Sequence, residues 1–341
     1  MIKTDLLAHD PDRWGHSLGN AAELLFSLLD AVRPQSILEI GAYAGDLTTE
    51  LVEWAKRNEA EVVAIDPGPH YDLLALAHRT LCLEVVREKS HDALRHVAVP
   101  DVAIVDGDHN YYTVSGELRI LAERSEGRPL PMFILHDVGW PHARRDTYFE
   151  PEDIPEEYRQ PLVEGPHLVP EETGTVDRGL LYHWAAAREG GSRNGVLTAA
   201  EDFVAEHDDL SLAVIPVFFG IGIVWSTAAP WASRIAELVA PWDRNPVLEW
   251  LEANRVFNLA RKNVLVAESG SLAERVEELE YRLAELARIN EQQRSLLRGL
   301  LDSRAFAVGD RLFRLRPRRG STASLSDQIR NTLAEGGDRS G

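Results

Sequence analysis

Acidic residues and histidines follow two apolar runs in the first half of the chain. Residues 102–112 read VAIVDGDHNYY and residues 133–137 read FILHD, so Asp106 and Asp137 each stand where an apolar run ends. If both runs are parallel strands, these acids project into one crevice at the carboxyl edge of the sheet. Carboxylates suit a divalent cation such as Mg²⁺. His109 could then remove a proton from a hydroxyl, because an imidazole with its ordinary pKa near 6.5 is a base at neutral pH.

A second group of residues has the spacing of a cofactor loop. Residues 36–48 read SILEIGAYAGDLT, in which Glu39 precedes Gly41-x-x-x-Gly45 and a helix is expected to follow. Glycines let the backbone approach a ligand closely, and a helix amino terminus offers free N–H groups. The dinucleotide motif G-x-G-x-x-G is not formed here. Glu39 therefore favours a ligand with a cationic end, and Asp66, at the end of VVAID, could accept both hydroxyls of a ribose.

Alternating strands and helices must position these side chains. The sequence predicts a doubly wound, Rossmann-like α/β sheet, mostly parallel, whose five apolar strands alternate with helices. These strands are Ser36–Ile40, Glu61–Ile65, Leu83–Val86, Val102–Val105 and Met132–Leu135. The segment LSLAVIPVFFGIGIVWS, residues 210–226, predicts an antiparallel hairpin that closes the sheet.

These motifs resemble class I S-adenosylmethionine-dependent methyltransferases, especially the catechol-type variant. The acids after the fourth and fifth strands resemble those of the metal-dependent macrolide-sugar O-methyltransferases and the cephalosporin hydroxylase-like proteins. The resemblance implies that Asp106 and Asp137 bind a metal and that His109 is the general base. The family usually has an adjacent acid pair where this chain has His136 and Asp137. Three alternatives follow: a metal other than Mg²⁺ binds, Asp108 substitutes, or His136 only lines the site.

The resemblance also assigns the remaining site residues. The implied cofactors are S-adenosylmethionine and Mg²⁺ or another divalent cation. The implied cofactor-binding residues are Glu39, Gly41, Ala42, Tyr43, Gly45, Asp66, Ser90, His91, Asp92 and Asp106. The expected metal ligands are Asp106, His136 and Asp137, with His109 catalytic.

Residues 138–200 interrupt the alternating pattern and predict an ordered insertion or lid. Within it, Arg144, Arg145 and Tyr148 are candidate substrate contacts, although an ordinary charged surface is an equal alternative. The expected reaction is O-methylation of a hydroxyl on a sugar or small polyol of a natural product or glycan. Two other functions remain open: a metal-dependent hydroxylase with a facial iron site, and a non-catalytic scaffold that keeps the methyltransferase fold.

Charge is divided unevenly along the chain. The net charge is −19, yet residues 294–319 hold eight arginines against Asp302 and Asp310. An acidic body excludes nucleic acid as an expected partner, whereas the basic end could touch an anionic membrane surface. Cys82 is the single cysteine, so no intrachain disulfide can form. With no leader-like or membrane-spanning apolar stretch in view, we expect a cytoplasmic protein.

The carboxyl-terminal part of the chain predicts a coiled coil. Apolar residues recur at alternating spacings of four and three, at Leu272, Val276, Leu279, Leu283 and Leu286. We expect a methyltransferase domain over 1–228, a helical connector over 229–268, a coiled coil over 269–300 and a basic amphipathic, partly disordered tail over 301–341. The coiled coil predicts a homo-oligomer.

Overall fold

A seven-stranded sheet forms the centre of the protein. The computed structural model describes residues 17–125, 127–314 and 324–335 and divides the chain into two compact units, 1–265 and 266–341. The strands are β1 (Ser36–Ile40), β2 (Glu61–Ile65), β3 (Leu83–Val86), β4 (Val102–Val105), β5 (Met132–His136), β11 (Leu210–Ile215) and β12 (Ile221–Ser226). Their order is β11-β12-β5-β4-β1-β2-β3, and β1 to β5 run parallel.

This topology confirms the predicted sheet. β12 runs antiparallel to both β5 and β11, so the predicted closing hairpin is confirmed. β4 and β5 are buried along their whole length, which explains their uninterrupted apolar sequences. β5 extends one residue beyond the predicted end and includes His136.

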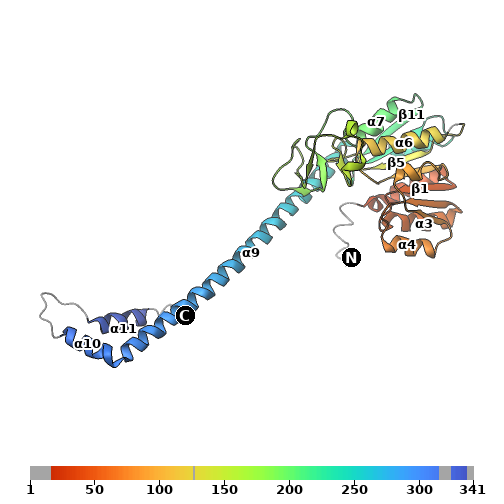
Figure 1. Cartoon of the computed structure of the whole chain (residues 1–341). Coiled ribbons are helices and arrows are strands. Elements are labelled where there is room, and N and C mark those ends of the chain that lie inside the picture. The colour runs from red at the N-terminus through yellow and green to blue at the C-terminus, as the bar shows by residue number, and fades with distance from the viewer. Residues whose placement is uncertain (1–16, 126, 315–323, 336–341) are drawn as a thin grey trace, which may run out of the picture. The chain divides into compact units, whose positions relative to one another are not determined.

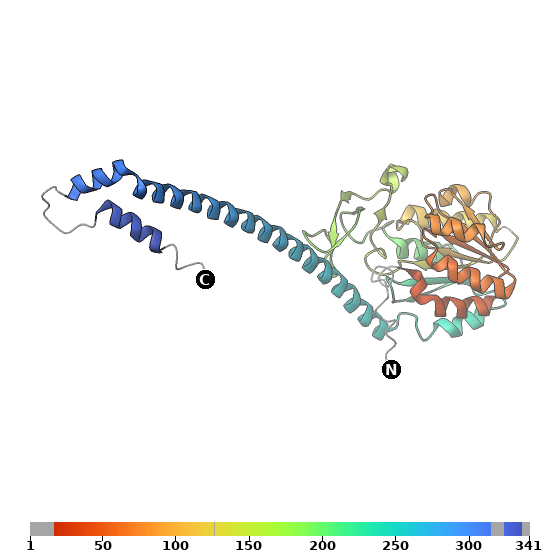
Figure 2. The ribbon, with the colours of Figure 1, turned by 90° about the horizontal axis from the view of Figure 1, so that it is seen from below.

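Helices cover both faces of the sheet (Figures 1 and 2). One face carries α2 (Ala22–Val32), α3 (Asp46–Asn58), α4 (Tyr71–His78) and α8 (Ala232–Val239). The other carries α5 (Ser90–Ala93), α6 (Tyr111–Arg124) and α7 (Val196–Ala205). Leu25, Leu51 and Ile235 are fully buried on the first face, and Leu118 and Leu94 on the second. The sheet is therefore covered by two apolar layers, as a parallel sheet requires.

The predicted insertion is ordered. It contains the three-stranded sheet β6 (Thr147–Tyr148), β10 (Trp184–Ala186) and β7 (Leu162–Glu164), and the pair β8 (His167–Leu168) and β9 (Leu180–Leu181). Two 3-10 turns, η3 (Pro151–Asp153) and η4 (Glu156–Tyr158), lie between β6 and β7.

Asp146 binds the insertion to the start of α6. Its Oδ1 accepts hydrogen bonds from the backbone N–H groups of Tyr111 and Gly195, each 2.7 Å away. The Tyr148 hydroxyl donates to Oδ2 at 3.0 Å. Burial raises the pKa of Asp146 to about 6 despite these bonds. One carboxylate thus joins the start of α6 to both ends of the insertion.

The first unit continues past the boundary predicted at residue 228. Ile235 and Val239 of α8 belong to the main core. The long helix α9 (Pro246–Asp302) adds Val256 and Ala260, which pack with Leu180 of the insertion. These contacts explain why the first unit ends at residue 265.

The second unit consists of the rest of α9 with α10 (Arg304–Arg314) and α11 (Leu325–Glu335). Arg294 of α9 donates to the carbonyl of Leu333, 3.1 Å away, and Ser326 of α11 donates to Asp310 of α10. Residues 315–323 and 336–341 of the tail that was predicted to be partly disordered lie outside the described residues. Of the helices that are described, none is both long and apolar enough to cross a membrane.

Candidate active site

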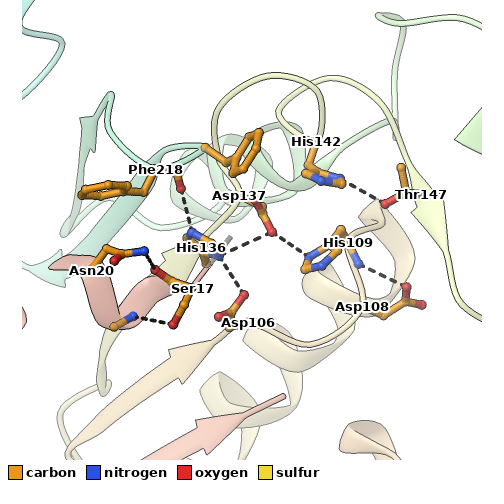
Figure 3. Close-up of polar contacts among 12 residues, drawn as sticks. Ser17, Asn20, Asp106, Asp108, His109, His136, Asp137, His142, Thr147 and Phe218 are labelled. Carbon is orange, nitrogen blue, oxygen red and sulfur yellow. Dashed lines mark hydrogen bonds and ion pairs between the residues drawn. The ribbon is translucent and has the colours of Figure 1, made fainter. Parts of the chain in front are cut away.

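Three potential metal ligands meet where β4 and β5 end. Asp106 follows β4, His136 is the last residue of β5, and Asp137 comes next. His136 Nδ1 lies 2.9 Å from Asp106 Oδ1 and 3.5 Å from Asp137 Oδ2 (Figure 3). One donor atom from each residue lies within 4.8 Å of the others. The neighbouring strands thus bring together the three residues expected to bind a metal.

The hydrogen bonds of His136 define its protonation. Its Nε2 lies 2.7 Å from the carbonyl oxygen of Phe218, which can only accept, so Nε2 carries a proton. Ionised carboxylates also only accept, so Nδ1 carries a second proton beside Asp106 and Asp137. Burial alone would lower the pKa of this imidazole, but the two carboxylates outweigh it and raise the pKa to about 10. Without a metal, an imidazolium therefore balances the two acids.

The donor set fits a divalent cation once Nδ1 is deprotonated. The Phe218 carbonyl would keep the Nε2 proton in place, a second-shell bond typical of metal-bound histidines. One imidazole nitrogen with two carboxylates suits Mn²⁺, Fe²⁺, Co²⁺ or Zn²⁺ better than Mg²⁺. Asp108 instead accepts from the side chain of Asn110 and the backbone N–H of His109. Of the three alternatives, the geometry favours His136 as third ligand and a metal other than Mg²⁺.

His109 lies next to this cluster in a position suited to a base. Its Nδ1 is 3.1 Å from Asp137 Oδ2, and its side chain is 22% exposed. When Nδ1–H donates to Asp137, Nε2 is left unprotonated and able to accept a proton. The Thr147 N–H donates to the His109 carbonyl at 3.0 Å, and the rings of His142 and Phe149 lie 4.7 and 6.2 Å from the His109 ring. The insertion thus forms a wall beside the candidate base.

The glycine loop lies against the same cluster. Gly41 and Gly45 have φ of +89° and +83°, and a Cβ on Gly41 would stand 1.9 Å from the Asp106 carbonyl oxygen. The Tyr43 N–H donates to Asp66 Oδ2 at 2.7 Å, while Gly68 N–H donates to Oδ1 at 2.8 Å. Each carboxylate oxygen can accept a further bond, so Asp66 is still able to bind ribose hydroxyls. Ala42 is buried in this loop, whereas the Tyr43 side chain is exposed.

Glu39 is the buried acid of the cofactor loop. Thr48 Oγ1 donates to its Oε2 at 2.6 Å. Burial raises the pKa of Glu39 to about 8, and nearby Asp106 and Asp66 add to the effect. An acid held in this way regains its charge when a cation binds beside it. The loop therefore fits S-adenosylmethionine, which carries an ammonium and a sulfonium.

Three of the residues implied to bind the cofactor, Ser90, His91 and Asp92, lie in the short helix α5. Ser90 begins it, and Asp92 lies in its first turn. His91 Nε2 lies 2.8 Å from the Thr113 carbonyl, and its ring meets that of Tyr112 at 5.3 Å. His91 therefore holds α5 against α6, which positions its neighbours at the edge of the sheet.

The candidate substrate contacts make bonds within the insertion and to α7. Arg145 is fully buried and donates to the carbonyls of Ala186 and Thr173, at 2.8 and 2.7 Å. Arg144 pairs with Glu201 of α7 at 2.6 Å, and Tyr148 donates to Asp146. These bonds stabilise the insertion, and none reaches the metal-ligand cluster. The role of Arg144, Arg145 and Tyr148 as substrate contacts stays a prediction.

Several site residues were not anticipated from the sequence. They are Thr48, which bonds Glu39, Phe218, whose carbonyl orients His136, and His142 and Phe149 beside His109. Figure 3 also draws Ser17 and Asn20, at the turn η2 (Leu18–Ala21), where the Asn20 side-chain amide donates to the Ser17 carbonyl at 2.9 Å. A carbonyl contact carries no sequence signal, and the sequence does not distinguish His142 and Phe149 from the other histidines and aromatic residues of the insertion, such as His167 and His183.

The site just described coincides with a family match. Residues 38–138 match the model of a family described as a methyltransferase domain, from Leu38 in β1 to Val138, directly after Asp137. This part of the chain is a methyltransferase domain. Its Gly41 loop and acid-tipped strands are the features that resemble class I, the S-adenosylmethionine-dependent class.

Solved methyltransferase structures are similar to part of the chain at low identity. A Podospora anserina methyltransferase bound to S-adenosylhomocysteine is 14% identical, with 64% of this chain and 83% of that chain covered and a TM-score of 0.39. The O-methyltransferase TomG of Streptomyces achromogenes, involved in tomaymycin synthesis and solved with S-adenosylmethionine, is 16% identical, with 65% and 85% covered and a TM-score of 0.37. Likenesses of this degree do not identify a substrate. No curated protein matches the chain.

Proposed function

We propose that the protein is an S-adenosylmethionine-dependent O-methyltransferase assisted by a divalent cation. The acceptor would be a hydroxyl on a sugar or small polyol of a natural product or glycan. The observation that carries the proposal is the shared carboxylate of Asp137, which lies 3.1 Å from His109 Nδ1 and 3.5 Å from His136 Nδ1. A candidate base and a candidate metal site therefore meet on one side chain, next to the loop of Gly41.

Cofactor binding would rest on two carboxylates. Glu39 would face the cationic methionine end, since its buried acid is stabilised in the charged form by a neighbouring cation. Asp66 would accept the ribose hydroxyls while its backbone contacts with Tyr43 and Gly68 fix its orientation. The cofactor supplies the electrophilic methyl group.

Methyl transfer to oxygen also needs removal of a proton and alignment of the acceptor. His109 Nε2 would take the hydroxyl proton while Nδ1–H keeps its bond to Asp137, which stabilises the imidazolium that forms. A cation bound by Asp106, His136 and Asp137 would lower the pKa of a coordinated hydroxyl. Phe149, which is 66% exposed, gives the acceptor an apolar surface beside the base.

The part of the proposal that names a sugar or polyol is supported by the resemblance to macrolide-sugar methyltransferases. The choice of oxygen over nitrogen or carbon is supported by the histidine base, because a hydroxyl must lose its proton to become an effective nucleophile.

Calorimetry with S-adenosylhomocysteine tests cofactor binding, and NAD is the control ligand. We expect binding of the former alone. Methyl transfer is then tested with labelled S-adenosylmethionine and a panel of sugars, polyols and phenols, in the presence of Mn²⁺, Co²⁺, Mg²⁺ or a chelator. Transfer that is unchanged in chelator would remove the metal from the proposal. Iron binding without S-adenosylhomocysteine binding would indicate the hydroxylase instead.

A further inference from the structure

One stripe of α9 in the second unit is apolar and exposed. Leu272, Val276, Leu279, Leu283 and Leu286 are each 52–66% exposed in the single chain. Their spacings of four and three place them along one side of the helix. Such a continuous exposed stripe on a long helix is typical of a surface that another helix covers.

The stripe can be assigned to heptad positions. Leu272, Leu279 and Leu286 take position d, and Val276 and Leu283 take position a. Continuing the register places Asn290 at the next a position, followed by Gln293 at d and Leu297 at a. In parallel coiled coils, leucine at d with a β-branched residue at a favours two helices over three or four, and Val276 is such a residue at one a position.

Asn290 strengthens this assignment. A single asparagine at an a position fixes register and favours a dimer, because two such amides can bond each other only when they face each other across the seam. Asn290 is exposed in the single chain. Any shift of one heptad would place it against leucine and leave the amide unpaired in an apolar seam. The residue therefore favours an in-register parallel pair.

Charges beside the seam agree with a parallel pair. Arg275 stands at position g and Glu280 at the following e position. In a parallel pair, g of one helix faces the next e of the other, so each Arg275 would meet a Glu280 of the second copy. An antiparallel pair brings g residues together, which would set Arg275 and Arg282 against arginines. The charges thus select orientation as well as partner.

From these observations we propose that α9 forms a parallel, in-register, two-stranded coiled coil with the α9 helix of a second copy of this chain, centred on Leu272–Asn290. The partner is a second copy because the apolar stripe, the Asn290 amide and the Arg275–Glu280 charges are each complementary to themselves. The proposal does not depend on the methyltransferase reaction.

Cysteine cross-linking of the full-length chain tests orientation and register. In a Cys82→Ser background, Leu272→Cys and Leu286→Cys are made separately, with Arg288→Cys at position f as the matched control. The two seam positions are separated by about 21 Å of helix, so only a parallel, in-register pair can bring both to their own copies. Under mild oxidation we expect at least tenfold more disulfide dimer from each seam variant than from Arg288→Cys. Equal cross-linking at all three positions, or at only one seam position, would overturn the proposal.

Sedimentation equilibrium tests the assembly itself. We expect the unmodified chain to be a dimer at micromolar concentration and Leu279→Lys/Leu286→Lys to be a monomer. Tyr281→Lys, at an f position, is the control and should stay dimeric. Binding of S-adenosylhomocysteine measured on the same samples reports whether the first unit is folded. A monomeric or trimeric unmodified chain, or a seam variant that stays dimeric, would refute the coiled coil whatever the outcome for methyl transfer.

Discussion

Replacing Glu39 by glutamine should affect stability and cofactor binding in opposite directions. The folded protein holds the Glu39 carboxyl in a dry site, where burial raises its pKa from 4.5 to about 8. Between these two values the folded state keeps a proton that the unfolded state has released. The stability that this proton provides is fully present below pH 4.5 and is lost as the pH rises through 8. Glutamine has the same shape and no such proton.

The magnitude follows from the width of this window. From pH 4.5 to pH 7, the free energy of unfolding of Glu39→Gln should improve relative to the unmodified chain by about 3 kcal/mol. Comparing two pH values removes any constant cost of accommodating the amide beside Thr48. Cofactor binding should weaken by about tenfold to a hundredfold, the value of one lost hydrogen bond to a charged group.

Urea unfolding at several pH values gives the first quantity, and calorimetry with S-adenosylhomocysteine gives the second. Glu117→Gln is the matched control, since burial raises the pKa of fully buried Glu117 to about 8 as well. It should show the same pH-dependent stabilisation and nearly unchanged cofactor affinity. A Glu39→Gln variant whose stability difference does not vary with pH would refute the burial argument, and unchanged affinity would refute the assigned role.

Three further changes test the site. The affinity for Mn²⁺ or Co²⁺ should rise about tenfold per pH unit between pH 7 and 9, because the metal displaces the Nδ1 proton of His136, whose pKa is about 10. In His136→Gln, calorimetry should find that the metal affinity does not rise with pH in this way. His109→Gln should lower the rate of methyl transfer by about 10² to 10⁴-fold and leave the affinity for S-adenosylhomocysteine unchanged. The residual rate should rise with pH. A pH profile like that of the unmodified chain would exclude His109 as the base. Gly41→Ala should lower the melting temperature far more than Gly127→Ala. Both glycines have positive φ, but only at Gly41 would an added Cβ clash with backbone, at 1.9 Å. Equal falls in melting temperature would mean that the positive φ alone accounts for the loss of stability.

The positions of the site residues could be predicted to the extent that strand ends position them. Asp66, Asp106 and Asp137 each follow an apolar parallel strand, and the carboxyl ends of such strands share one edge. The alternation of apolar strands and helices was thus enough to predict that the three candidate metal ligands and the glycine loop lie at one edge of the sheet. His136 could be found but not assigned, since its role depends on a carbonyl from the β11–β12 turn, 82 residues away.

The insertion could not be interpreted in the same way. Its residues are positioned by hydrogen bonds between distant loops, such as those from Arg145 to the carbonyls of Thr173 and Ala186. A buried arginine that bonds only to backbone has the same sequence appearance as one that awaits a ligand. Non-local bonds of this kind, unlike strand periodicity, leave no regular pattern.

The bonds of Asp146 have a consequence for how acceptor choice could change over evolution. Because this one carboxylate binds the N–H groups of Tyr111 and Gly195, the polypeptide between Thr147 and Asn194 leaves and rejoins the domain at a single point. A loop of different length or shape could replace part of that stretch while α6 keeps its place, provided that the Thr147 N–H still binds the His109 carbonyl and Leu180 still packs against α9. The same architecture would let an engineer graft a new acceptor-binding loop onto an unchanged methyl-transfer centre.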